Sequence, residues 1–110
     1  MVNHLIIDFS AKRGIDKKDF LLGVVKDIAK ITKMKILKGP IAIKGNVRPG
    51  FTCFAIIEES HISIHTFTDT NTANLDVFSC KNFNEKKIIE YIKKKFDAKI
   101  LKIYSINRLI

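Results

Sequence analysis

The sequence of 110 residues has no tryptophan, two prolines, two cysteines and only three arginines among its 20 basic residues. Two cysteines cannot form the disulfide framework of a small secreted domain, and they cannot form a zinc site alone. The three histidines lack zinc-ligand spacing. No apolar run approaches the roughly 18–20 residues that cross a bilayer, and the first residues lack a signal-peptide pattern. We therefore expect a cytoplasmic protein with neither a metal site nor a membrane partner.

Positive charge, in contrast, is plentiful, and the formal net charge is +9. Nucleic-acid binding is one interpretation of this charge, and a lysine-rich background composition is the other. Base and phosphate recognition favours arginine, whereas this chain carries 17 lysines, scattered except for Lys93–Lys95. We favour the background interpretation and expect no nucleic-acid partner. A basic, non-catalytic binding module remains the alternative function of a different class.

The apolar pattern predicts one domain, residues 1–110, of the α+β class. Hydrophobic residues make up 46% of the chain, enough for one modest core. Alternation and short apolar runs predict strands at His4–Phe9, Ile36–Lys44, Phe51–Ile57, Ser60–Phe67, Ala73–Cys80 and Lys99–Ile106. Helical spacing predicts helices at Lys17–Thr32, capped by Asp16, and from the cap Asn84 to Asp97. Short turns between most strands favour a two-layer α/β sandwich, with a mostly antiparallel sheet and both helices on one face.

Serine and histidine gather in E-S-H-I-S-I-H-T, from Glu59 to Thr66, and D-V-F-S-C follows, ending at Cys80. On composition alone this segment is a strand with polar side chains. A serine hydrolase is a weak interpretation, because no G-x-S-x-G surrounds Ser60. Together the two motifs resemble, without a gap, the self-processing segment of the prokaryotic-type S-adenosylmethionine decarboxylase family, whose members depend on a pyruvoyl group.

The resemblance implies a proenzyme that cuts itself between Glu59 and Ser60. The products are a β chain, residues 1–59, and an α chain, residues 60–110. By this likeness Ser60 Oγ attacks the Glu59 carbonyl and forms an ester, and His65 then accepts the Ser60 Cα proton. A pyruvoyl group remains at position 60, forms a Schiff base with the substrate amine and takes up the electron pair left by decarboxylation. Neither a metal nor pyridoxal phosphate is expected.

Further site residues follow from the same likeness. Cys80 matches the family's proton donor in catalysis, and a perturbed thiol suits a general acid near neutral pH. The hydroxyl of Thr52 is a candidate to support processing by stabilising an oxyanion, although threonine is also an ordinary strand residue. Cys53 has no such match and is expected in the core. We interpret His61 as structural or as a hydrogen-bond partner of Ser60.

The open face of the sheet is expected to carry Ser60, His65 and Cys80. The family's small chains pair into dimers with pockets near the interface, so a homodimer of cleaved protomers is expected here too. A protomer of this size has little surface with which to enclose a ligand alone.

Substrate contacts are expected from Phe67 and Asp69, where the family carries a tryptophan and a glutamate. Asn46 stands where the family often has a second aromatic residue. The resemblance gives S-adenosylmethionine as the nominal small-molecule substrate, in polyamine and spermidine biosynthesis. L-arginine or L-ornithine is the alternative substrate for the same pyruvoyl chemistry, because Asp69 can also pair with a cation.

Overall fold

The structure, a computed structural model, describes residues 1–110 and contains six strands and two helices. In chain order these elements are β1 (Val2–Ser10), α1 (Lys18–Thr32), β2 (Ile36–Lys44), β3 (Phe51–Ile57), β4 (Ser60–Phe67), β5 (Thr72–Ser79), α2 (Glu85–Phe96) and β6 (Lys99–Arg108). The predicted order of elements is correct.

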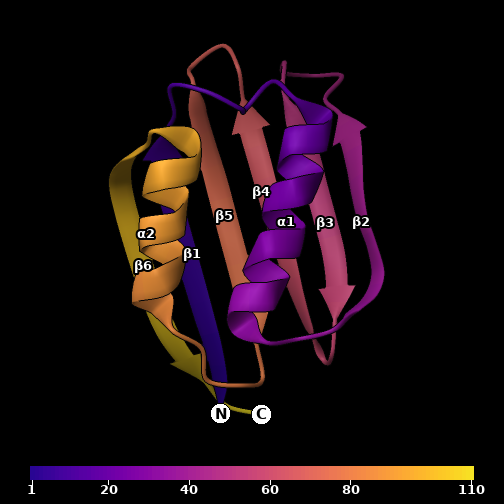
Figure 1. Cartoon of the computed structure of the whole chain (residues 1–110), viewed down its shortest axis with the longest axis vertical. Helices are drawn as coiled ribbons and strands as arrows, with labels where there is room; N and C mark the ends of the chain where they lie inside the picture. The colour runs from indigo at the N-terminus through magenta and orange to yellow at the C-terminus, as the bar shows by residue number, and fades with distance from the viewer.

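The six strands form one sheet with the order β2-β3-β4-β5-β1-β6, and every neighbouring pair is antiparallel. Both helices lie on the same face of this sheet, and no element covers the other face (Figure 1). The α+β sandwich with a mostly antiparallel sheet is therefore confirmed. We refer to the uncovered side as the open face.

Alternating side chains decide which side of each strand meets the helices. On β5, Ala73, Leu75 and Val77 are fully buried, whereas the residues between them are partly exposed. The same alternation buries Ile62 and Ile64 of β4. These side chains and the inner faces of both helices form one core of 22 buried residues. Burial of this apolar surface is the main force that holds the sandwich together.

One predicted helix cap is correct and the other is wrong. Asn84 Oδ1 accepts a hydrogen bond of 3.0 Å from the Lys87 backbone N–H, as an N-cap should. Helix α1, however, begins at Lys18, so its N-cap is Lys17, which makes no side-chain capping bond. Asp16 lies one residue too early in the preceding turn to reach the free N–H groups of the first turn. Neither helix is long and apolar enough to span a membrane.

The two helices are joined by a hydrogen bond of 2.6 Å, which Tyr91 Oη on α2 donates to Asp27 Oδ2 on α1. Burial is the main cause that raises the pKa of Tyr91 above the ordinary phenol value, and the hydrogen bond and charge of Asp27 act in the same direction. The neutral phenol is therefore the form that the folded state favours.

We predict that Tyr91→Phe lowers the free energy of unfolding by about 1 kcal/mol, because Asp27 loses its donor. The raised pKa means that the contribution of Tyr91 is complete below the unfolded phenol's pKa of about 10 and is lost as the pH rises above it. Urea unfolding at pH 7 and at pH 11 measures both effects. Tyr104→Phe is the matched control, since that ring is exposed. Equal losses in the two variants would contradict the role of the bond.

Candidate active site

Ser60 begins β4 directly after a two-residue turn formed by Glu58 and Glu59. Glu59 has a φ of +46°, in the left-handed region that non-glycine residues seldom adopt. The Ser60 side chain is buried, and its Oγ accepts a hydrogen bond of 3.0 Å from the Cys80 backbone N–H. The hydroxyl in turn lies 3.7 Å from Cys80 Sγ, to which it donates. The serine is thus held in place immediately after a strained turn.

Cys80 follows the last residue of β5 and is half-buried. Its thiol points to the same turn, with Sγ 3.7 Å from the Glu58 carbonyl oxygen and 4.0 Å from Glu59 Oε2. A pocket of about 410 Å³ opens beside it, lined by Met1, Asn3, Cys80, Asn82 and Asn107. The structure therefore brings together Glu59, Ser60 and Cys80.

Thr52 and His65 form a second pair, at the other end of β4. They are opposite each other in the β3–β4 register, and Thr52 Oγ1 lies 3.1 Å from His65 Nδ1. Both side chains are exposed on the open face. Five residues of strand separate His65 from Ser60, about 17 Å at the usual rise per residue. The ladders to β3 and β5 run without a bulge over this length. Within one protomer, the structure does not bring His65 to Ser60.

The open face was expected to carry the side chains of Ser60, His65 and Cys80, and this expectation is wrong for Ser60. His65 and Cys80 are in register with the open face, but Ser60 shares the alternation of the buried residues Ile62 and Ile64. Ser60 reaches Cys80 only because both residues lie at the strand ends, beside the turn. The period of two along β4 explains the difference, because residues 60 and 65 must point to opposite sides.

His61 does not contact Ser60, and the structural interpretation fits it better. Its ring is stacked between Phe54, at 5.5 Å between centroids, and Phe78, at 5.3 Å. His61 Nε2 lies 3.3 Å from Asp76 Oδ1, and His4 Nε2 lies 2.8 Å from the same oxygen. These contacts join four neighbouring strands, β3, β4, β5 and β1, on the open face.

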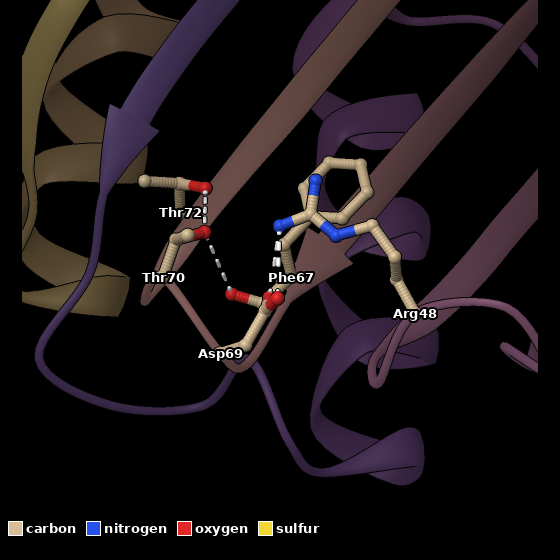
Figure 2. Close-up of polar contacts among 5 residues, drawn as sticks. All are labelled: Arg48, Phe67, Asp69, Thr70 and Thr72. Atoms are coloured by element: carbon tan, nitrogen blue, oxygen red, sulfur yellow. Dashed lines mark hydrogen bonds and ion pairs between the residues drawn. The ribbon is translucent and has the colours of Figure 1, made fainter.

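Beside Thr52 and His65 lies a pocket of about 270 Å³, whose wall includes Asn46, Arg48 and Phe67. The sequence pattern does not single out Arg48, which lies between the predicted strands Ile36–Lys44 and Phe51–Ile57. Figure 2 shows its guanidinium over the Phe67 ring, 4.7 Å from the centroid, with Nη2 3.0 Å from both oxygens of Asp69. No motif or periodicity marks this arginine, because its contacts depend on how the β2–β3 loop packs against the end of β4.

Glycine is required where this loop meets β4. Gly50 has a φ of +142°, and a Cβ there would lie 1.8 Å from the Thr66 carbonyl oxygen. The Thr68 N–H also donates to the Pro49 carbonyl oxygen at 3.0 Å. The β2–β3 loop is therefore fixed against the end of β4, and this contact positions Arg48 beside Phe67 and Asp69.

Cys53 differs from Cys80 in its burial. It is fully buried in the core, as expected, and burial raises the pKa of its thiol to about 11 although the charge of Lys18 acts in the opposite direction. No group of three or more His, Cys, Asp or Glu side chains is arranged to hold a metal ion.

Comparison with known proteins identifies the class of this arrangement. The sequence profile of the S-adenosylmethionine decarboxylase family matches residues 3–109. Similar curated relatives include the S-adenosylmethionine decarboxylase proenzymes of Clostridium botulinum strains Langeland and Hall, each 31% identical over 108 residues, which is 96% of this chain and 91% of the relative. These matches define a decarboxylase. The chain belongs to the S-adenosylmethionine decarboxylase family, so the resemblance read from the motifs is confirmed.

We predict that iodoacetamide at pH 8 labels Cys80 and spares Cys53, because alkylation needs an accessible thiolate. The raised pKa leaves Cys53 protonated at this pH, and its burial excludes the reagent. Peptide mass mapping of the folded protein should show one labelled thiol, and the same treatment in urea should show two. Cys80→Ser should abolish labelling of the folded protein, whereas Cys53→Ala should not change it. Equal labelling of both thiols before unfolding would contradict the assignment.

Proposed function

We propose that the chain is a self-processing, pyruvoyl-dependent decarboxylase that cleaves itself between Glu59 and Ser60. The observation that carries this proposal is the buried Ser60 hydroxyl, held by Cys80 directly after the positive-φ residue Glu59. The confirmed family membership supports the decarboxylase class. These residues suit a pyruvoyl group chemically, because Ser60 can serve as its precursor and the thiol of Cys80 lies beside it.

The first step of processing needs only groups at this turn. Ser60 Oγ bonds to the Glu59 carbonyl carbon, the peptide C–N bond breaks, and the hydroxyl proton passes to the nitrogen. The amide thereby becomes an ester with a free amine on residue 60. The left-handed conformation of Glu59 costs on the order of 1–3 kcal/mol, which cleavage can release. A base then takes the Ser60 Cα proton and Glu59 leaves as a carboxylate. Hydrolysis of the remaining enamine releases ammonia and produces the ketone.

The pyruvoyl group supplies the electrophilic carbonyl that decarboxylation of an amino acid needs. Cys80 is proposed to return a proton to the substrate carbon after CO₂ leaves. Its support is proximity, since Sγ lies 3.7 Å from Ser60 Oγ and points to the same turn. A pocket opens beside the thiol, so a substrate can approach it.

The base of processing is proposed to be His65 from a second copy of the chain. β4 is straight, so His65 and its partner Thr52 cannot meet Ser60 of their own protomer. In the proposed dimer, the open faces of two copies pack together about a two-fold axis that runs perpendicular to the strands. β4 then faces β4 of the other copy in the reverse direction, and each Thr52–His65 pair faces the Ser60–Cys80 end opposite.

Apolar side chains at both margins of the open face support the homodimer. On one side Ile41, Ile43, Phe54 and Ile56 are between 38% and 65% exposed, and on the other Tyr104 and Ile106 are 46% and 42% exposed. A water-facing surface with so many large apolar groups is typical of a protein interface. A second copy would cover them and enclose both pairs of active-site residues.

S-adenosylmethionine is the nominal substrate, and this assignment is supported by the names of the family and its relatives. The product would then serve polyamine biosynthesis, in the cytoplasm as the sequence predicts. One observation favours L-arginine as a second candidate, with L-ornithine as its shorter analogue. Phe67 and Asp69, the expected substrate contacts, already hold a guanidinium, that of Arg48.

We predict that Ser60→Ala leaves one chain of 110 residues, because alanine has no oxygen to attack Glu59. The wild type should give two chains on a denaturing gel and release CO₂ from one of S-adenosylmethionine, L-arginine or L-ornithine. Ser60→Ala should release it from none. The matched control is Ser63→Ala, a buried serine on the same strand, which should still cleave. A wild-type chain that stays whole would favour the binding module, and cleavage of Ser60→Ala would exclude the mechanism.

We predict that His65→Ala alone stalls at the ester, which added hydroxylamine cleaves because it attacks esters faster than amides. Co-expressing His65→Ala with a tagged Ser60→Ala chain should restore normal cleavage of the His65→Ala chain. In the mixed dimer, one site combines the intact Ser60 with the intact His65 of the other copy. If His65 acted within its own protomer, mixing would restore nothing, and that result would reject the site shared between two copies.

A further inference from the structure

Arg48 lines the pocket beside Thr52 and His65, where Phe67 is one of the expected substrate contacts. Its guanidinium lies 4.7 Å from the Phe67 centroid and pairs with both oxygens of Asp69 (Figure 2). Arg48 and Phe67 line one pocket together with Thr52 and His65. The guanidinium of Arg48 thus covers the Phe67 ring in a pocket that is also lined by Thr52 and His65, the proposed processing pair.

This position removes the two contacts that a nucleoside would use there. A flat base stacks on an aromatic face, and sugar hydroxyls donate to a carboxylate. Arg48 already covers the ring of Phe67 and engages both oxygens of Asp69. Asn46 also lines this pocket, and its amide is not an aromatic face. A neutral ring must therefore displace Arg48 before it can stack on Phe67.

The contacts available in this pocket favour binding of a guanidinium over binding of a neutral ring. A planar cation gains both from the face of the aromatic ring and from the carboxylate. Arg48 is delivered to this position by a loop whose ends are joined, since the Gly45 N–H donates to the Gly50 carbonyl oxygen at 2.8 Å. The backbone of this loop is therefore held in place, and it presents the half-exposed guanidinium of Arg48 to the pocket.

We propose that Arg48 is a specificity-determining residue, whose guanidinium occupies the ring-stacking position on Phe67 and selects against ligands that carry a neutral base. The inference rests on the proposed function, because it takes this pocket as the substrate site. The Arg48 and Asp69 side chains are 49% and 44% exposed, so the pair is weak and can be displaced. Exposed ion pairs and cation–π contacts each change affinity by a factor of a few, which together gives about tenfold.

Calorimetric titration with 5′-methylthioadenosine, a neutral adenine nucleoside, tests this proposal on the purified full chain. Arg48→Ala should bind the nucleoside about tenfold more tightly than the wild type, because the ring of Phe67 becomes free. The gain should disappear in the double variant Arg48→Ala/Phe67→Ala. Lys26→Ala, which removes an equal charge from an exposed position on α1, is the matched control and should bind like the wild type.

Equal affinity of the wild type and Arg48→Ala would overturn the proposal. So would a gain that survives the loss of Phe67, or an equal gain in Lys26→Ala, because both would indicate a general charge effect. The same samples are run on a denaturing gel to separate this result from the proposed function. An uncleaved wild-type chain rejects pyruvoyl chemistry whatever the affinities are, whereas cleaved chains with unchanged affinities reject only the role of Arg48.

Discussion

The straight ladder of hydrogen bonds that holds β4 between β3 and β5 is the constraint on which the candidate active site depends. A strand paired on both sides cannot bend without losing ladder bonds, and each buried group left unpaired costs free energy. The ladder therefore fixes Ser60 at one end of β4 and His65 at the other. It also positions their partners. The β3–β4 register sets Thr52 opposite His65, and Cys80, directly after the end of β5, contacts Ser60.

This separation divides the proposed chemistry into two halves. One end holds the nucleophile, the strained peptide bond and a thiol, and the other holds a hydroxyl–imidazole pair and the pocket that contains Arg48. In the proposed dimer, the same apolar contacts that bury the open faces would complete each site. Processing would then require assembly, so that a lone protomer stays an intact precursor. The fold thus explains how a small chain could keep the reacting groups apart until it meets its copy.

The sequence predicts the fold well because the elements depend on local periodicity. Alternation identifies β5 and the buried side of β4, and Asn84 is found as a cap because its side chain acts three residues away. Asp16 fails as a cap because helix boundaries shift by one or two residues with little change in pattern. The expectation that groups Ser60 with His65 and Cys80 on the open face is wrong for Ser60, because alternation along β4 places residues 60 and 65 on opposite sides of the sheet.

Arg48 could not be predicted because its role depends on contacts between loops that are distant in sequence. No periodicity reports that the β2–β3 loop lies against the end of β4, a contact that depends on Gly50 having no Cβ. The departures from the family pattern also concentrate at this end, at Asn46, Phe67 and Asp69. The residues at the Ser60 end instead keep the family motif. The strand ends place Ser60 and Cys80, whereas loops place the pocket wall. Substitutions in the loops can therefore change which ligand binds without moving the groups that are proposed to cut the chain.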